Sequence, residues 1–496
     1  MDDANLSEEK MTISNLEPKR LWKHFEDICT IPRGSGNEKG VIAHVLGFAA
    51  EHGLDARTDS VGNVVITKPA APGVTGPGIV LQAHMDMVCE KNNDTVHDFE
   101  KDPIRPIIHG EVVKATGTSL GADNGIGMAA AMALLEEDFA NPHLEALFTV
   151  DEETGLVGAA ALTADLVKGR ILLNLDSEED GLFYIGCAGG QDAVFRLPLD
   201  RKSIDGETWQ LKVSGLAGGH SGCDINRNRG NALSFAGNMI QSILEPCGIH
   251  IVSITGGSKR NAIPREASAL IAITPDMVER ASEIITSLTE VIRTTLPSED
   301  AGFNVSFSKT DPSITPEFAP MSHHSTRKVL ALLGGIPSGV IAMSREMEGL
   351  VETSCNMAIA STSGEMLEIV CSGRSSVAGS IKTLALRLVA LGHGLGAHVK
   401  CGDGYPGWRP DPSSPLIGKA SEVFSRLYGQ TPEVTAIHAG LECGLIGERV
   451  PDMSMISFGP TIRNPHSPDE FVEIASVGRF YTFIRELVIT LGREGI

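Results

Sequence analysis

Several features that mark other classes of protein are absent from this sequence of 496 residues. No apolar run approaches the roughly 18 residues that a membrane span needs, so we expect no transmembrane helix. The opening stretch MDDANLSEEK has neither a basic segment nor an apolar core, so we expect no secretory signal. The nine cysteines are scattered and never form a CxxC motif. This usage predicts free thiols in a reducing, cytoplasmic protein rather than a disulfide framework or a zinc knuckle.

Basic residues are scarce relative to acidic ones. Lys and Arg together number 41 against 63 Asp and Glu, which gives a net charge of −22 with His neutral. Such a surplus repels phosphate backbones and anionic lipids, so we expect no nucleic-acid or membrane partner. Neither a P-loop nor a GxGxxG motif lies in a strand–turn–helix context, which argues against a nucleotide-dependent enzyme. Some of the surplus carboxylates can be metal ligands, whose charge a cation would offset.

The order of apolar and amphipathic segments predicts an α/β fold in residues 1–190. Short apolar runs that suit buried strands alternate there with helical patterns. The predicted strands are 63–67, 78–82, 147–150 and 171–175, and the predicted helices are 17–29, 37–52 and 129–137. We therefore expect a mixed, largely parallel sheet that is covered by helices.

From residue 191 the pattern changes to strands of alternating polarity with amphipathic helices. Strands are predicted at 209–213, 269–273, 304–308 and 366–371, and helices at 231–244, 275–296 and 380–391. The α/β pattern returns later, with helices 415–428 and 476–491 and a strand at 434–437. We expect an inserted α+β domain at 191–404 between two parts of a catalytic domain, 1–190 and 405–496. Whether the insertion consists of two similar halves, about 191–300 and 301–404, stays open.

Seven candidate residues carry metal-binding or proton-transferring side chains at strand ends or in tight loops. They are His84, Asp86, Asp123, Glu152, Glu153, Asp176 and His466. The carboxyl ends of parallel strands meet at one edge of an open α/β sheet, which is where ligands bind. Two histidines with three or more carboxylates make a suitable ligand set for two Zn²⁺-like ions, one carboxylate bridging them.

Each of these residues also has a purely structural interpretation when it is taken alone. An aspartate at a strand end is usually a helix cap or a turn residue. A buried histidine is usually a satisfied core side chain, and the pair Glu152–Glu153 alone would most often be a solvated loop. Only the convergence of these residues favours a metal site, and the spacing by itself supports the two interpretations about equally.

A two-metal site also needs a carboxylate that is not a ligand. Bound metals lower the pKa of a water, and a neighbouring carboxylate takes its proton and passes it to the leaving amine. Adjacent glutamates can divide these tasks, which is the functional interpretation of Glu152 and Glu153. Asp86, two residues after His84, can orient the imidazole.

Eight segments in the same order resemble the M20 metallopeptidase family, and within it the aminoacyl-histidine dipeptidases. They are HMDMVCEKN, SLGADNGIGMAAA, DEETG, LDSEEDG, GGHSG, RNAIPREA, HAGLECG and GPTIRNPHSPDE, and the match spans residues from about 15 to 490. The resemblance implies a zinc-exopeptidase-like catalytic domain that carries an inserted lid domain, and the lid often forms the dimer. We therefore expect a homodimer.

The resemblance also implies roles for the seven candidates. One metal is held by His84 and Asp176, the other by Glu153 and His466, and Asp123 bridges them. Glu152 is then the general acid/base and Asp86 supports His84. The two divalent ions are expected to be Zn²⁺, although Co²⁺ and Mn²⁺ suit the same ligands.

Three residues of the insertion match family positions that contact substrate. His220 in GGHSG stabilises the tetrahedral intermediate, and Asn261 and Arg374 hold the substrate. The chemistry suits these roles, because His and Asn donate to an oxyanion and Arg clamps a carboxylate. Without the resemblance, His220 would be a turn residue and Arg374 a surface cation. Glu442 is a weaker candidate to face the amino group of a dipeptide, and the role of Arg409 stays open.

We therefore predict a metal-dependent dipeptidase that cleaves unblocked dipeptides. We expect Xaa-His substrates, including β-alanyl-histidine, and attack by a metal-bridging hydroxide with Glu152 as general base. The alternative within the family is a deacylase, an aminoacylase or a carboxypeptidase on the same metal site, because fold and ligands do not fix the substrate. A remote alternative is a serine hydrolase, because GTSLG fits the GxSxG pattern with Ser119 as nucleophile.

Overall fold

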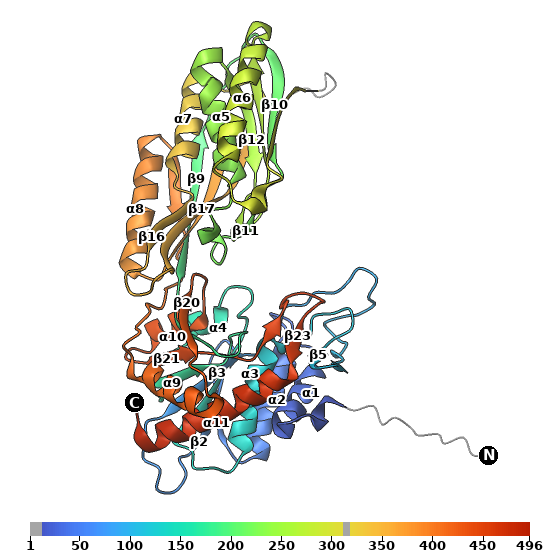
Figure 1. The fold of residues 1–496 in the computed structure, drawn as a ribbon, viewed down its shortest axis with the longest axis vertical. Helices are drawn as coiled ribbons and strands as arrows, with labels where there is room; N and C mark the ends of the chain where they lie inside the picture. Colours follow the sequence, from blue (N-terminus) through green and yellow to red (C-terminus); the bar gives the residue numbers. More distant parts are fainter. Residues whose placement is uncertain (1–11, 311–317) are drawn as a thin grey trace, which may run out of the picture. The chain divides into compact units, whose positions relative to one another are not determined.

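The computed structural model describes residues 12–310 and 318–496. The first ten residues, on which the expectation of no secretory signal rests, lie outside this part. None of the helices in the described part is both long enough and apolar enough to cross a membrane. The chain divides into two compact units (Figure 1). Unit 1 comprises the residues up to Gly186, Pro410–Ala436 and Leu441–Ile496, and unit 2 comprises Cys187–Arg409 and Ile437–Gly440.

An eight-stranded mixed sheet forms the centre of unit 1. In their order across the sheet, its strands are β1 (Asp55–Thr58), β2 (Val64–Lys68), β6 (Leu144–Thr149), β3 (Ile79–His84), β7 (Ile171–Asn174), β21 (Ser454–Ser457), β8 (Leu182–Cys187) and β20 (Glu433–Ile437). The central strands β6, β3, β7 and β21 run parallel. Every residue of β3, β6 and β7 is buried, as expected for strands covered on both faces. The predicted fold class is confirmed.

Helices cover this sheet. They are α1 (Lys19–Cys29), α2 (Lys39–Glu51), α3 (Ala122–Glu136), α4 (Val157–Ala161), α9 (Pro415–Tyr428), α10 (Glu442–Arg449) and α11 (Ile474–Glu494). Helix α3 packs against β3 and β6, α2 against β1 and β2, and α9 and α10 against β21. The sequence placed the start of α3 at residue 129, but the helix begins at Ala122. Asp123 therefore lies in its first turn, where Asp123 and Asn124 have non-helical backbone angles.

A smaller sheet of unit 1 carries the last candidate ligand. Its strands are β22 (Ile462–Arg463), β23 (Phe471–Glu473), β5 (Val112–Lys114) and β4 (Ile107–His109). Strands β22 and β23 are antiparallel neighbours, with Ile462 opposite Val472. Residues 464–470 therefore form a hairpin loop, and His466 is held within it.

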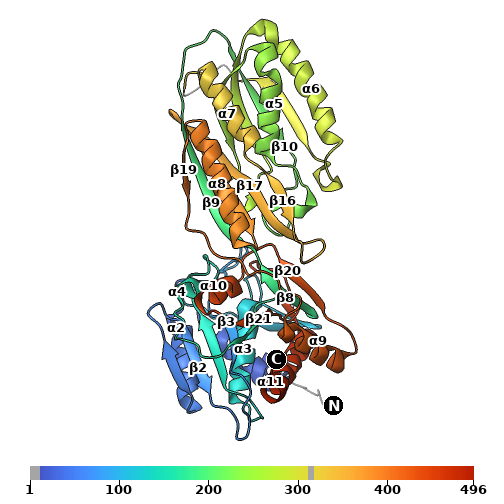
Figure 2. The ribbon, with the colours of Figure 1, turned by 90° about the vertical axis from the view of Figure 1, so that its left-hand side faces the viewer.

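The main sheet of unit 2 is antiparallel and has helices on one face (Figure 2). In order across the sheet its strands are β15 (Asn304–Lys309), β10 (Glu207–Ser214), β14 (Ala267–Ile273), β12 (His250–Gly256), β17 (Val351–Ser363), β18 (Met366–Ser375), β9 (Gly189–Pro198) and β19 (His398–Cys401), with β16 (Gly339–Met343) beside β17. The helices are α5 (Ala232–Cys247), α6 (Val278–Arg293), α7 (His323–Gly335) and α8 (Ala378–Gly394). Their apolar faces and the facing strand residues form one continuous core.

Two βαββαβ repeats, one nested inside the other, supply all strands of this sheet except β16. The first is β10-α5-β12-β14-α6-β15 and the second is β9-α7-β17-β18-α8-β19. In both, the first strand lies between the third and the fourth. A division into consecutive halves at residue 300 is therefore wrong, because β15 pairs with β10 of the first repeat and β9 pairs with β18 and β19 of the second.

Candidate metal centre

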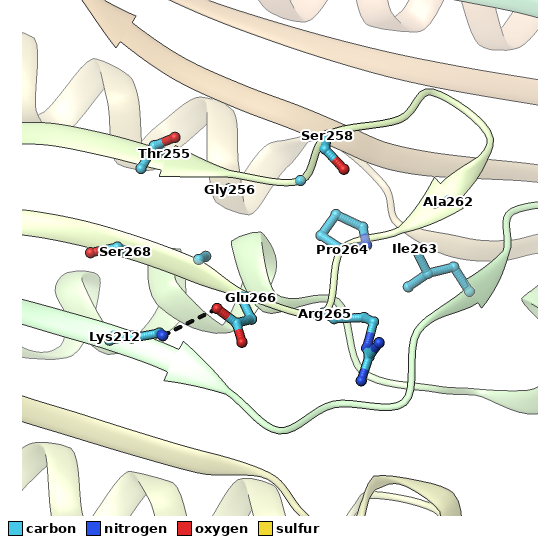
Figure 3. A pocket seen from close by; sticks show the side chains of 12 residues that line it. Lys212, Thr255, Gly256, Ser258, Ala262, Ile263, Pro264, Arg265, Glu266 and Ser268 are labelled. Carbon is cyan, nitrogen blue, oxygen red and sulfur yellow. Dashed lines mark ion pairs between the residues drawn. The ribbon is translucent and has the colours of Figure 1, made fainter. Parts of the chain in front are cut away.

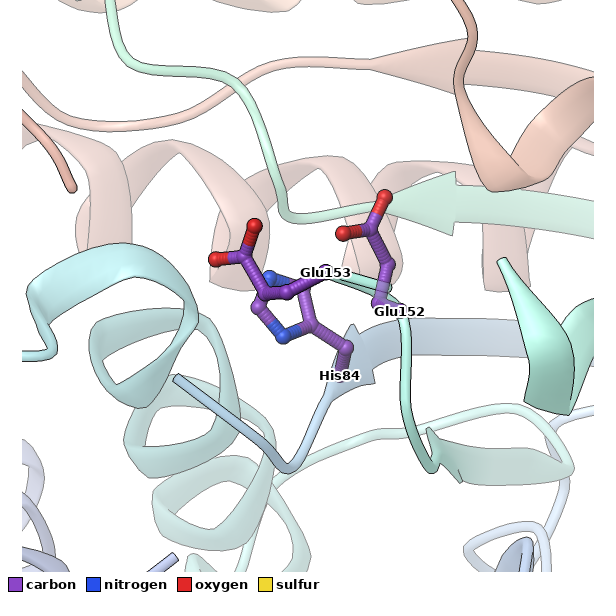
Figure 4. A group of neighbouring side chains, drawn as sticks. All are labelled: His84, Glu152 and Glu153. Carbon is purple, nitrogen blue, oxygen red and sulfur yellow. The ribbon is translucent and has the colours of Figure 1, made fainter. Parts of the chain in front are cut away.

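Three parallel strands of unit 1 end side by side and bring the candidate residues together. Strand β3 ends at His84, β6 at Thr149 and β7 at Asn174. The register places His84 opposite Thr149 and Gln82 opposite Asn174, so the loops after β6 and β7 leave the sheet beside His84. Figure 4 shows the outcome for two of these strands. The carboxylates following β6, those of Glu152 and Glu153, lie beside the His84 ring and point the same way.

All five residues predicted as metal ligands come together in two groups that share Asp123. His84 Nε2 lies 3.1 Å from Asp123 Oδ1 and 3.3 Å from Asp176 Oδ1. His466 Nε2 lies 3.0 Å from the other oxygen of Asp123, Oδ2, and 3.1 Å from Glu153 Oε1. Within each group, the potential ligand atoms all lie within 4.8 Å of one another. One carboxylate thus faces both groups, one oxygen to each.

The chemistry of this donor set fits two divalent cations. Two imidazoles and three carboxylates are a mixed nitrogen and oxygen set that Zn²⁺, Co²⁺ and Mn²⁺ accept. Burial opposes ionisation of the Asp123 carboxyl, but hydrogen bonds from His466 and His84 outweigh it and lower its pKa. Hydrogen bonds with Asp123 and Glu153 raise the pKa of His466 to about 11. The carboxylates therefore draw positive charge onto the histidines, and bound cations would take the place of those protons.

Asp86 lies behind His84 rather than in either group. Its Oδ1 is 3.3 Å from His84 Nδ1. Its two oxygens also accept the backbone N–H groups of Glu152 and Glu153, at 3.0 and 3.2 Å, and Ser35 Oγ donates to it at 2.8 Å. This carboxylate thus lies beside the imidazole and fixes the loop that carries both glutamates, and its support of a metal-bound His84 stays a prediction.

Glu152 and Glu153 differ in their surroundings although they are neighbours in the chain. Glu153 has the imidazole of His466 at 3.1 Å. The Glu152 side chain forms no hydrogen bond or ion pair with any residue that the structure describes, although one of its oxygens lies within 4.8 Å of potential ligand atoms of His84 and Glu153. Burial, with the charges of Asp176 and Glu442, raises the pKa of Glu152 well above its usual range. A buried carboxyl group that readily holds a proton and lacks fixed partners is suited to acid–base chemistry.

A second polar layer lies one step deeper along the same strands. Gln82 and Thr149 both donate to Glu442 Oε2, the latter at 2.8 Å, and Asn174 donates to Gln82 Oε1. Gln82 lies two positions before His84 in β3, so these two side chains share a face of the sheet, and Asn174 ends β7 two positions before Asp176. Glu442 is fully buried, and burial raises its pKa to about 7.

Sequence reasoning missed two buried charged residues next to the ligands, Arg33 and Glu470. Each is 2% exposed, and each bonds to the backbone rather than to a ligand side chain. The available signal was the glycine pattern of the GADNG segment. A Cβ at Gly121 or Gly125 would lie 2.6 or 2.8 Å from Arg33 Nη2, so these glycines leave room for the guanidinium group.

The three substrate-contact candidates lie in unit 2. His220 ends the short strand β11 (Gly219–His220), which pairs with β13 (Ala262–Ile263), and the Asn261 carbonyl accepts the N–H of Ser221 at 2.8 Å. His220 Nδ1 accepts the N–H groups of Gly222 and Cys223, at 3.3 and 3.0 Å. The neutral ring therefore carries its proton on Nε2, which makes His220 a donor. Burial and the charge of Arg374 lower the pKa of His220 and favour this neutral form.

Arg374 is a buried cation without a counter-ion. It is 7% exposed, and its Nη1 donates to the Tyr405 hydroxyl at 3.0 Å. Its Nε lacks a hydrogen-bond partner, and no carboxylate of the described residues is within ion-pair distance. Nearby, burial and the Arg374 charge lower the pKa of His438 to about 4. An unpaired guanidinium is costly to bury, so this arrangement calls for an anionic ligand.

Ser119 does not have the surroundings of a nucleophile. Its side chain is buried, and its Oγ donates to the carbonyl of Val88 at 2.7 Å and accepts the N–H of Glu90 at 3.3 Å. No histidine is hydrogen-bonded to it among the described residues. The hydroxyl holds the 88–90 segment in place, and the serine-hydrolase alternative has no structural support.

A cavity of about 540 Å³ in unit 2 is lined by none of the ten candidates, although its lining residue Ala262 follows Asn261 in the chain and pairs with His220 (Figure 3). It is open to solvent beside the ends of β12 and β14 and is lined in part by Thr255, Pro264 and Arg265. Its Lys212 and Glu266 form an ion pair at 3.1 Å, so their charges offset each other. Arg265, whose Nε donates to the carbonyl of Leu216, forms no ion pair with a described residue, so the cavity has one unpaired cationic side chain and no cluster of metal-binding side chains.

The chain belongs to the peptidase family M20/M25/M40, whose family model matches residues 80–490. Peptidases of this family are metal-dependent. The prediction of a metal-dependent hydrolase that acts on peptide bonds is therefore confirmed.

Two relatives match nearly the whole chain. The cytosol non-specific dipeptidase of Escherichia coli is 42% identical over 480 residues, which cover 96% of this chain and 98% of the relative. The crystal structure of the aminoacylhistidine dipeptidase of Vibrio alginolyticus superposes with a TM-score of 0.90 at 40% identity, covering 96% of this chain and 98% of that one. A tripeptidase from Staphylococcus aureus, at 16% identity and a TM-score of 0.55, shares the fold.

Proposed function

We propose that the protein is a metal-dependent dipeptidase that hydrolyses unblocked dipeptides. His84 and Asp176 hold one divalent cation, Glu153 and His466 hold the other, and Asp123 binds both. The observation that carries this proposal is the position of Asp123, whose two oxygens each face the imidazole of a different group at 3.0–3.1 Å. The two relatives that match nearly the whole chain are both named as dipeptidases, which supports the substrate class.

Glu152 is the proton carrier of the proposed reaction. The cations, when bound, would polarise the scissile carbonyl and acidify a water molecule. Glu152 then takes a proton from the attacking water and gives it to the leaving amine, which its lack of a fixed partner leaves it free to do. Asp86 keeps this residue in place by holding the backbone N–H of Glu152. His220, with its proton on Nε2, is the donor that stabilises the developing oxyanion, and Asn261 assists in holding the substrate.

Arg374 binds the carboxylate at the C-terminal end of the dipeptide. The support for this assignment is the unpaired state of its buried guanidinium group. Planar, two-pronged contacts make Arg well suited to a carboxylate. Recognition of a free C-terminus in this way would disfavour amides and esters, which lack the carboxylate.

Replacing Arg374 by glutamine is expected to lower kcat/KM for a dipeptide by about 30-fold or more, mainly through KM. The loss corresponds to about 2 kcal/mol, the lower end of what removing one partner of a buried charged pair costs. The measurement is steady-state hydrolysis of alanyl-histidine and of its C-terminal amide. The amide lacks the carboxylate, so wild type and variant should cleave it equally slowly. Arg196→Gln, which removes an exposed arginine of the same unit, is the matched control.

The names of the two relatives also bear on which dipeptides are cleaved. We propose that Xaa-His dipeptides, including β-alanyl-histidine, are among the substrates, because one relative is named an aminoacylhistidine dipeptidase. The other is named non-specific, so non-histidyl dipeptides are included. That relative is also named cytosolic, which supports a cytoplasmic location. The homodimer stays a prediction.

The proposed function is tested with five compounds, before and after chelation and metal restoration. They are β-alanyl-histidine, alanyl-histidine, leucyl-glycine, a tripeptide and an N-acetyl amino acid. We expect chelator-sensitive cleavage of the three free dipeptides, with the activity regained when Zn²⁺, Co²⁺ or Mn²⁺ is added. Cleavage of the acetylated compound alone would instead identify a deacylase. Activity that resists chelation would contradict the metal site.

A further inference from the structure

The position of Asp123 depends on three chain segments that are far apart in the sequence. Residues 84–86 supply His84, the first turn of α3 supplies Asp123, and the hairpin loop 464–470 supplies His466. Asp123 can face both imidazoles only if all three segments keep their spacing. The question is therefore which side chains hold these segments together.

Glu470 joins the hairpin loop to the start of α3. Its two oxygens accept the N–H groups of the four consecutive residues 120–123, at 2.7, 2.9, 2.8 and 3.3 Å. The last of these N–H groups belongs to Asp123 itself. Because Glu470 lies in the same loop as His466, one carboxylate fixes the loop of one ligand onto the backbone of the next.

Arg33 joins residues 84–86 to the same turn. Its Nη1 donates to the carbonyls of Met85 and Asp86, at 3.0 and 2.6 Å, and its Nη2 donates to the carbonyl of Gly121. Gly121 thus receives both clamps, Arg33 on its carbonyl and Glu470 on its N–H. The guanidinium group and the carboxylate also lie close enough for their charges to interact.

A carboxylate at a helix N-terminus is common and stabilises a helix without any further role. Two features of Glu470 go beyond an ordinary cap. The side chain comes from a distant loop that also carries the proposed ligand His466. Both carboxylate oxygens of Glu470 accept hydrogen bonds from the segment that carries Asp123. An ordinary cap is local and satisfies one or two N–H groups.

We propose that Glu470, together with Arg33, is a positioning residue that sets Asp123 between the two cations. Neither side chain forms a hydrogen bond or an ion pair with the side chain of a proposed ligand in the described part of the chain. Their effect is transmitted through the backbone of residues 120–123. This inference rests on the proposed function only in that cations bind at Asp123.

The test is to titrate the metal-free Glu470→Gln variant with Co²⁺ and to compare its metal binding with that of the wild type. Glutamine keeps the size of the side chain but turns an amide NH₂ toward backbone N–H donors, so the turn at 120–123 is released. We expect the apparent affinity for Co²⁺ to fall by about 10- to 100-fold, the usual range for residues that orient ligands. The visible absorption bands of the loaded protein should also change, while KM for a dipeptide at saturating metal should not.

Asp469→Asn is the matched control, because it removes the same charge from the neighbouring, exposed residue. It should bind Co²⁺ as the wild type does. A second variant, Glu470→Asp, keeps the charge but has a side chain that is one methylene shorter, so it should also weaken Co²⁺ binding. If circular dichroism shows that Glu470→Gln is unfolded, the Co²⁺ affinity of Glu470→Asp tests the inference instead. A folded Glu470 variant with wild-type affinity and spectrum would overturn the inference. If the wild type binds two cations but cleaves no dipeptide, the proposed function is wrong, and the Co²⁺ titration still tests the positioning role of Glu470.

Discussion

Replacing Glu152 by glutamine is expected to lower kcat by about 10³- to 10⁴-fold while both cations stay bound. The carboxyl group contributes a proton transfer that an amide cannot perform, but it is not one of the five ligands proposed here. Glutamine has the same size, so the loop held by Asp86 should keep its conformation. The measurements are kcat for alanyl-histidine at saturating metal and the metal content of the purified variant.

Glu178→Gln is the control for a purely electrostatic effect. Its carboxyl group interacts with the charges of Asp123 and Asp176, as that of Glu152 does with Asp176. We expect this control to keep most of the wild-type kcat, since no proton transfer is assigned to it. If Glu152→Gln retains its metals and turns over at a comparable rate, Glu152 is not the acid/base. Loss of a cation from Glu152→Gln would instead make it a ligand.

The candidate metal ligands could be recognised in the sequence because of where parallel strands end. His84 and Asp176 follow apolar strands, and parallel neighbours in a sheet place such residues at one edge. Which groups they form could not be derived in this way. The assignment of Asp123 to both groups came from the family resemblance, and the structure supplies a geometric reason for it, in the two distances from its oxygens to His84 and His466.

Arg33 and Glu470 could not be predicted, because they act on the backbone. A side chain that bonds to N–H and C=O groups places no demand on the type of its partner residues, so no recognisable pair of residues appears in the sequence. Their only trace is steric. Gly125 argues against a helix by propensity, which is why the start of α3 was predicted too late. Its missing Cβ is what lets Arg33 and Phe25 pack against the first turn.

The nested repeats of unit 2 were hidden for a topological reason. Strand β9 is separated in sequence from the rest of its repeat by the whole of the first repeat, from β10 to β15. Each strand could be recognised from its own residues, but the partner of each strand depends on contacts between distant segments. Periodicity reports the local conformation and the buried face, and it carries no information about strand order.

Replacing Asp123 by asparagine is expected to remove both cations and to lower turnover by at least about 10⁴-fold, because the reaction depends on the metals for both water activation and carbonyl polarisation. Asparagine keeps one oxygen and loses the charge, and its NH₂ group must face one of the two cation positions. Each position therefore loses a charged ligand at the same time. The metal content of the purified variant, measured by mass spectrometry, should be close to zero per chain.

The matched control is Asp176→Asn, since Asp176 belongs to only one of the two groups. It should lose one cation and keep the other. The wild type, Asp176→Asn and Asp123→Asn should therefore bind about two, one and no cations, which is the result expected if Asp123 is shared by both groups.

Thermal unfolding gives an independent readout. Metal at about 1,000 times its Kd stabilises a folded protein by about 4 kcal/mol, so the wild type should melt at a higher temperature with metal than without. Asp123→Asn should show no such difference. If it keeps one cation at wild-type affinity, Asp123 serves a single site and the two groups are independent.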